Sequence, residues 1–135
     1  ATVIRRCWDL LGDGRIFQFG IRSGDGPEFR WAEAGHVEMR RFDLRGFAQT
    51  VRALEDKPLY VTVDLDVLDP AVFPGTGTPE AGGVTFMELL TAILALQGAN
   101  VVACDLNELS PPYDPSGTST ATALKTLREL LLAIL

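Results

Sequence analysis

The chain has 135 residues, 47% of them hydrophobic, with a formal net charge of −6 and an isoelectric point near 4.7. This acidic balance argues against a nucleic-acid partner, because binding to a phosphate backbone depends on clustered Lys and Arg. No apolar run approaches the roughly 18 residues that a membrane span needs, and no signal-peptide pattern is visible, so we expect no membrane contact and a cytoplasmic location.

Helical and strand patterns alternate along the chain. Helices are indicated by apolar residues three and four positions apart, and strands by short apolar runs between turn-forming residues. We expect helices over residues 2–11, 27–35, 43–54, 86–97 and 119–135, and strands over 15–21, 36–42, 59–65 and 100–106. This alternation predicts an α/β fold with right-handed crossovers and a parallel sheet, in one domain.

Several local signals sharpen these elements. Asp43 is a plausible N-cap for the third helix, and Thr85 with Glu88 has the spacing of a capping box for the fourth. The last helix is expected to present an apolar stripe made of Ala123, Leu124, Leu127, Leu130 and Leu131. Cys7 and Cys104 lie far apart and are expected to be reduced thiols of the core.

The most informative stretch is the strand that runs into Asp64 and Asp66. If both lie on the strand, they point the same way with Cα atoms roughly 6.5 Å apart. Two like charges at the end of a buried strand need a cation or several donors, and two carboxylates suit a hard ion such as Mg²⁺ or Mn²⁺. Asp69 precedes Pro70, so we expect it to form a turn rather than bind a metal.

The carboxyl ends of parallel strands meet at one rim of a sheet, where ligands gather. Asp64, Asp66 and Glu108 fall on that rim, whereas His36 precedes its strand and should lie at the opposite end. The segment PGTGTPEAGG at 74–83 has two prolines and four glycines, a composition typical of a loop held close to a ligand or another backbone. The spacing does not match a calcium loop, and a single histidine gives too few nitrogen donors for a mononuclear zinc site.

Three segments together resemble the ureohydrolase family, which contains the arginases and agmatinases, and they are closest to its agmatinase members. The segments are VTVDLDVLDPAVFPGTGTPEAGG at 61–83, QFGIRSG at 18–24 and DLNELSPPYDPSGTSTATA at 105–123. The resemblance implies a three-layer α/β/α fold with a central parallel sheet and a binuclear manganese centre, in which Mg²⁺ or another divalent ion is an alternative. It also implies a homo-oligomer, a trimer or hexamer.

The resemblance assigns roles to four residues. It implies that Asp64 bridges both metal ions, that Asp66 binds one of them, and that Glu108 holds the guanidinium of a small cationic substrate. Thr78 is expected beside that group. The implied reaction is hydrolysis of agmatine to putrescine and urea, with guanidinobutyrate or arginine as alternative substrates.

The remaining ligands of the family, two histidines and further aspartates, belong to an N-terminal half that these 135 residues lack. We therefore expect residues 1–135 to be the C-terminal part of a single arginase-like domain, about half of it. The chain alone should be inactive and prone to aggregation, and it offers no catalytic residue that we can identify.

Two other classes remain open. A haloacid-dehalogenase-like phosphatase also carries Asp-x-Asp after an apolar strand, which the DLDVL segment fits loosely. A non-catalytic metal-binding half that retains the carboxylates of the rim is the second alternative.

Overall fold

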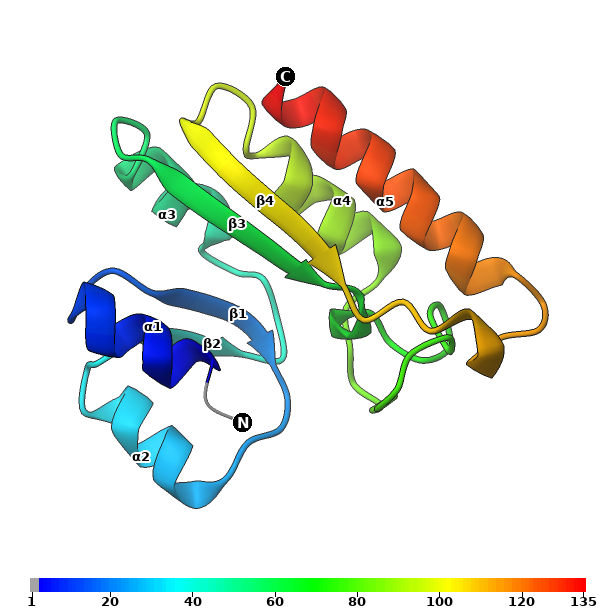
Figure 1. Cartoon of the computed structure of the whole chain (residues 1–135), viewed down its shortest axis with the longest axis horizontal. Coiled ribbons are helices and arrows are strands. Elements are labelled where there is room, and N and C mark those ends of the chain that lie inside the picture. The colour runs from blue at the N-terminus through cyan, green and yellow to red at the C-terminus, as the bar shows by residue number, and fades with distance from the viewer. Residues whose placement is uncertain (1–2) are drawn as a thin grey trace.

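The computed structural model describes residues 3–135, and it contains four strands that run in the same direction but form two separate pairs (Figure 1). The elements in chain order are α1 (Val3–Leu11), β1 (Phe17–Ile21), α2 (Gly26–Glu33), β2 (Glu38–Arg41), α3 (Phe47–Ala53), β3 (Leu59–Asp64), α4 (Phe86–Leu94), β4 (Val101–Asn107) and α5 (Thr118–Ile134), with short 3₁₀ turns η1 (Leu65–Val67) and η2 (Pro111–Tyr113). All nine predicted elements are present, each within four residues of the expected bounds, and Thr2 lies outside the described residues.

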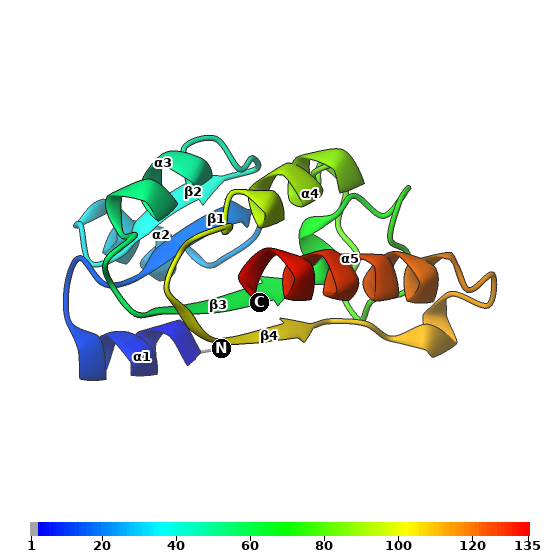
Figure 2. The ribbon, with the colours of Figure 1, turned by 90° about the horizontal axis from the view of Figure 1, so that it is seen from above.

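The single sheet that the sequence predicted is divided in the structure. β1 pairs in parallel with β2, and β3 pairs in parallel with β4, but no strand ladder within residues 3–135 joins the two pairs. Figures 1 and 2 show that the strands of both pairs point toward the same end of the molecule. Their carboxyl ends therefore share one rim, as the crossover rule requires.

The main core lies between the β3–β4 pair and the helices α3, α4 and α5 (Figure 2). Its fully buried side chains are Leu65, Leu68, Phe73, Leu96 and Leu130. Burial of a side chain of this size contributes about 1.5–3 kcal/mol to folding. Val61 and Val63 of β3 pack against this core, so the alternate residues of that strand face the other way.

The other face of the β3–β4 pair is polar and open within the described chain. Asp105 accepts hydrogen bonds from Thr62 Oγ1 at 2.6 Å, from Asn107 Nδ2 at 2.5 Å and from the Tyr60 hydroxyl. These donors lower the pKa of Asp105, with Thr62 the strongest cause. Tyr60 is 65% exposed, so helices cover the β3–β4 pair on only one side in residues 3–135.

Of the two helix N-caps that the sequence predicted, the one on α4 is present and the one on α3 is not. The capping box at α4 is confirmed, because Thr85 accepts from the Glu88 backbone N–H and Glu88 accepts from that of Thr85. The predicted cap at Asp43 is wrong. α3 begins at Phe47 after Gly46, and the Asp43 carboxylate instead accepts from the backbone and side chain of Arg45, a local turn that competes with capping.

The predicted apolar stripe of α5 is also partly wrong. The residues that α5 buries are Ser119, Ala123, Thr126, Leu130 and Ala133. Most of these are small, which lets α5 approach α4 closely, whereas Leu124, Leu127 and Leu131 lie on the exposed side. The buried face of α5 is therefore rotated by about one residue from the face that hydrophobicity alone predicts.

The first helix packs against α2 through an aromatic cluster. Trp8 meets Trp31 edge to face, and His36 stacks on Trp31 while its Nδ1 lies 2.9 Å from an Asp13 carboxylate oxygen. His36 thus lies before β2, away from the rim, as expected. Cys7 and Cys104 are both free thiols, as predicted, but they are only partly buried.

Among the helices of residues 3–135, none combines the length and apolar character that crossing a membrane requires.

The two sides of α5 can be compared by substitution. We expect Leu130→Ala to lower the free energy of unfolding by about 2–5 kcal/mol, because it leaves a cavity where the side chain is fully buried. Leu124→Ala on the same helix, where the side chain is 63% exposed, should change it by less than about 0.5 kcal/mol. Denaturant unfolding measures both, and equal losses would contradict the packing of α5 described here.

Candidate functional site

Three loops meet at the rim formed by the carboxyl ends of β1, β3 and β4 (Figures 1 and 2). They are residues 22–25 after β1, residues 65–83 after β3 and residues 108–117 after β4. The predicted site residues Asp64, Asp66, Thr78 and Glu108 all lie at the end of β3 or β4 or in the loops that follow.

Asp64 and Asp66 are neighbours, but not through the strand geometry that the sequence suggested. β3 ends at Asp64, and Asp66 lies within the 3₁₀ turn η1, so the prediction that both side chains project from one strand face is wrong. Partial burial raises the pKa of both carboxyls, the charge of Glu108 raises the pKa of Asp64 further, and the charge of Asp64 raises that of Asp66. The fold therefore brings three acidic groups into mutual repulsion.

Glu108 has a backbone conformation that its residue type rarely adopts. It follows β4 directly and has a φ of +70°, in the left-handed region. A non-glycine residue in this region costs of order 1–3 kcal/mol unless its surroundings compensate, and such residues cluster at functional sites. The next turn is fixed because the Ser110 N–H donates to the Gly75 carbonyl at 2.7 Å. Nothing in the sequence signals this conformation.

Asp69 closes the glycine-rich loop at one end. Its carboxylate accepts from the backbone N–H groups of Ala71 at 3.0 Å, Gly82 at 2.8 Å and Gly83 at 3.2 Å. These bonds lower its pKa, with the Ala71 bond the strongest cause. Gly83 permits the closure, because a Cβ there would lie 2.3 Å from the Asp69 nitrogen. The prediction that Asp69 forms a turn is confirmed.

Asp114 and Ser119 hold the other part of the same loop. Ser119 Oγ accepts from the Gly75 N–H at 2.8 Å, and a Cβ on Gly75 would lie 2.7 Å from the Ser119 Cβ. The Asp114 carboxylate accepts from the N–H groups of Ser116 and Ser119 and from the Ser116 hydroxyl, and these bonds lower its pKa to about 2. Loop 70–83 is thus fixed to the start of α5.

Thr78 lies between these two attachments and is exposed to solvent. Its neighbour Thr76 is 2% exposed, and its Oγ1 has no hydrogen-bond partner within residues 3–135. The structure thus keeps Thr78 on the accessible part of the loop.

The loop after β1 contributes two residues that our sequence analysis did not single out. Arg22 donates to the carbonyl of Val67 at 2.9 Å and to that of Asp66, and the Ser23 hydroxyl donates to the carboxylate of Glu80. Their only signal was membership of the GIRSG segment, which itself carries no chemical pattern.

The described residues fit part of a metal centre. Within residues 3–135, no three His, Cys, Asp or Glu side chains are grouped so that they could hold a metal ion. Asp64 and Asp66 nevertheless supply two hard oxygen donors. Burial raises the pKa of both carboxyls most and neighbouring negative charges raise it further, and a bound cation would oppose both effects.

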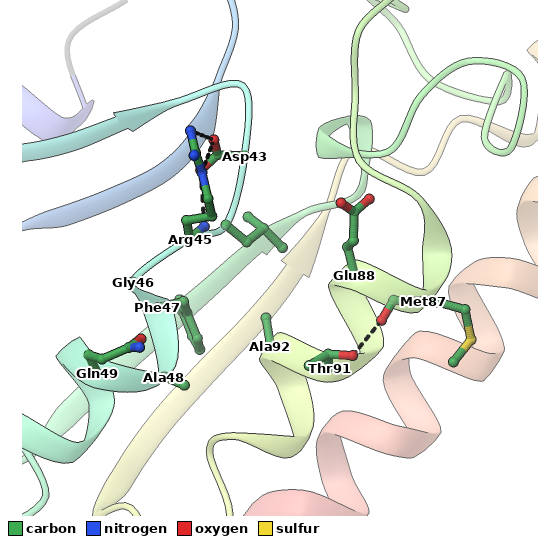
Figure 3. Close-up of a pocket in the computed structure, with 11 residues that line it drawn as sticks. Asp43, Arg45, Gly46, Phe47, Ala48, Gln49, Met87, Glu88, Thr91 and Ala92 are labelled. Atoms are coloured by element: carbon green, nitrogen blue, oxygen red, sulfur yellow. Dashed lines mark hydrogen bonds and ion pairs between the residues drawn. The ribbon is translucent and has the colours of Figure 1, made fainter.

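A separate hollow of about 370 Å³ lies between the start of α3 and the first turns of α4 (Figure 3). Its charged groups are already engaged, since Asp43 pairs with Arg45 and Glu88 caps α4. None of the four predicted site residues lines it. We therefore place the candidate site at the rim and not in this hollow.

Comparisons with known proteins agree on one family. A family model described as the arginase family matches residues 1–133. The agmatinase of Bacillus anthracis is 47% identical over 135 residues, covering 98% of this chain and 47% of the relative. The mitochondrial guanidino acid hydrolase of Homo sapiens is 40% identical over 143 residues, covering 96% of this chain and 40% of the relative.

The solved structures agree as well. A Clostridium difficile protein described as a candidate agmatinase superimposes with a TM-score of 0.94 at 50% identity, covering 98% of this chain and 49% of that one. The fold is therefore arginase-like, with parallel strands, and the chain spans about half the length of the relatives it matches.

The repulsion within the carboxylate group can be tested without metal. We expect Asp64→Asn to lower the pKa of Asp66, because the Asp64 charge is the second cause of its elevation after burial. Titration of the Asp66 carboxyl carbon by NMR in chelator-treated protein measures this. Asp56→Asn, an exposed site before β3, serves as the control. An Asp66 pKa that stays the same in Asp64→Asn would mean that the two groups do not interact.

Asp114 should make stability depend on acid pH. Since folding lowers its pKa from about 3.9 to about 2, its contribution is fully present above about pH 4 and is lost as the pH falls toward 2. We expect Asp114→Asn to destabilise the chain at about pH 6 and to differ much less from the wild type at about pH 2.5. Denaturant unfolding at both pH values is the measurement. Glu55→Gln is the control, and a loss of stability independent of pH would refute the linkage.

Proposed function

The chain belongs to the arginase family, and we infer from this membership that the complete protein hydrolyses a guanidino compound, with agmatine as the first candidate, to an amine and urea. The observation that carries the proposal is the placement of three carboxylates at one rim, with Asp64 at the end of β3, Asp66 in η1 and Glu108 directly after β4. Such a group is costly to keep unless cations occupy it. A divalent metal ion and a guanidinium are two such cations.

Asp64 and Asp66 are the residues of this chain that would hold manganese, or another hard divalent ion, through their carboxylate oxygens. Activation of the attacking water at neutral pH is the chemistry that the metal pair supplies when bound. The remaining ligands would come from a segment outside residues 1–135, so that the chain forms the C-terminal part of one arginase-like domain.

Glu108 would bind the substrate. A guanidinium is planar and presents paired N–H donors, and a carboxylate accepts two of them at once. The left-handed backbone at Glu108 turns the chain immediately after β4, beside the end of β3 where Asp64 lies. Thr78, which is exposed on loop 70–83, would contact the same guanidinium. The acidic net charge of the chain is compatible with a cationic substrate.

The identity of the substrate rests on the relatives. The Bacillus relative is an agmatinase, and agmatine would yield putrescine and urea. The human relative, at 40% identity, carries the name of a guanidino acid hydrolase, so a guanidino acid such as guanidinobutyrate is the second candidate. The arginase family match disfavours the phosphatase alternative. A homo-oligomer, a trimer or hexamer, is part of the same proposal.

The proposal is tested on the full-length product of the gene that encodes this chain. We expect manganese-dependent release of urea from agmatine, and no activity from residues 1–135 alone, because two carboxylates do not complete a metal centre. Replacing Asp64 or Asp66 by Asn should reduce kcat by about 100-fold or more. Glu108→Gln should raise KM for agmatine by about 10-fold or more, since it removes a charged hydrogen-bond acceptor.

Glu55→Gln, an exposed carboxylate away from the rim, is the matched control and should retain activity. Faster hydrolysis of guanidinobutyrate than of agmatine would identify a guanidino acid as the substrate instead of agmatine. Full activity in Asp64→Asn would remove the basis of the proposal.

A further inference from the structure

Arg22 connects the two halves of the described fold at the candidate site. It leaves the end of β1, and its guanidinium reaches the turn that carries Asp66 on the other strand pair. One terminal nitrogen donates to the Val67 carbonyl at 2.9 Å, and the other donates to the Asp66 carbonyl. The side chain is partly buried, so this contact excludes much of the water that would weaken it.

The backbone beside Arg22 also touches that turn. Gly20 has a φ of +76°, and a Cβ at this position would lie 2.5 Å from Cγ2 of Val67. Only glycine allows so close an approach. The segment 20–23 therefore packs directly on η1, and Ser23 extends the contact to Glu80 in loop 70–83.

The turn is anchored at its ends by Leu65 and Leu68, which are buried in the main core, and Arg22 adds a contact to the residues between them. η1 has three residues, and such short 3₁₀ turns have poor hydrogen-bond geometry. Inside the β3–β4 unit, the Leu65 carbonyl accepts from the Leu68 N–H, and the Val67 carbonyl accepts from the Val84 N–H. The bond from Arg22 to the Asp66 carbonyl acts on the residue whose side chain belongs to the site.

We propose that Arg22 is a positioning residue, which directs the Asp66 carboxylate into the site by holding the carbonyls of Asp66 and Val67. The role of Asp66 as a metal ligand rests on the function proposed above. A direct role of Arg22 in substrate binding is disfavoured by charge, since a guanidino substrate is itself a cation. The guanidinium also lowers the pKa of Asp66, against the stronger effects of burial and of the Asp64 charge.

The test uses the full-length protein and the variants Arg22→Met and Arg22→Lys. The control is Arg45→Met, an exposed arginine that pairs with Asp43 away from the rim. Hydrogen–deuterium exchange of the amides of residues 65–68 in chelator-treated protein reports the turn itself. Titration with Mn²⁺ reports the metal site, and steady-state kinetics with agmatine at low and saturating Mn²⁺ report catalysis.

We expect Arg22→Met to speed exchange in residues 65–68 and to weaken Mn²⁺ binding by about 10–100-fold, the usual range for loss of a supporting contact at a metal site. Saturating Mn²⁺ should recover most of kcat, and KM for agmatine should stay near the wild-type value. The exchange rate and Mn²⁺ affinity of Arg22→Lys should lie between those of the wild type and of Arg22→Met, because an ammonium can reach one carbonyl but not both.

The outcomes separate this proposal from the proposed function. If the wild type does not hydrolyse agmatine but Arg22→Met still loosens the turn and weakens Mn²⁺ binding, the substrate is wrong and the role of Arg22 stands. If the wild type is active and Arg22→Met matches Arg45→Met in exchange and metal affinity, the role of Arg22 is refuted. A rise in KM alone, at unchanged metal affinity, would also overturn it. Should Arg22→Met fail to fold, Arg22→Lys decides by the same measurements.

Discussion

The candidate site depends on carboxylates that accept hydrogen bonds from the backbone. Asp69 gathers three N–H groups of the glycine-rich loop, and Asp114 gathers those at the start of α5, where Ser119 in turn holds Gly75. Without these bonds, a loop of this glycine content would have many conformations, and fixing it would cost conformational entropy that its own side chains do not repay. Asp69 and Asp114 therefore give this glycine-rich loop one defined conformation at the rim.

The acidic residues at this end of the molecule therefore divide into two groups by their surroundings. Asp69 and Asp114 have lowered pKa values because donors surround their charges, whereas Asp64 and Asp66 have raised pKa values because burial and neighbouring charges oppose theirs. The first group is satisfied by the protein itself. The carboxylates of the second group have fewer such donors, and a positively charged ligand would stabilise their ionised form.

Sequence reasoning succeeded where the chemistry is local. The alternation of elements, the capping box of Thr85 and Glu88 and the turn at Asp69 all depend on residues within a few positions of one another or on simple periodicity. It failed where packing or backbone strain decides. The buried face of α5 is decided by close packing, as where Ser119 fits against Gly75 while Leu124 is exposed, and no propensity predicts a left-handed Glu108.

The position of Asp66 shows the same limit at the centre of the site. A period-two pattern correctly associates it with Asp64, yet the strand stops and a 3₁₀ turn carries the second carboxylate. A turn is easier to reorient than a strand held by a ladder, so contacts from other elements add to the buried Leu65 and Leu68 in fixing its direction.

Those contacts come from the β1–β2 pair, which shares no ladder with β3–β4 in the described chain. Gly20 and Arg22 therefore join the two pairs at the point where the Asp66 carboxylate is set. Within residues 3–135 the polar face around Asp105 is open, and the chain spans about half the length of the relatives that it matches.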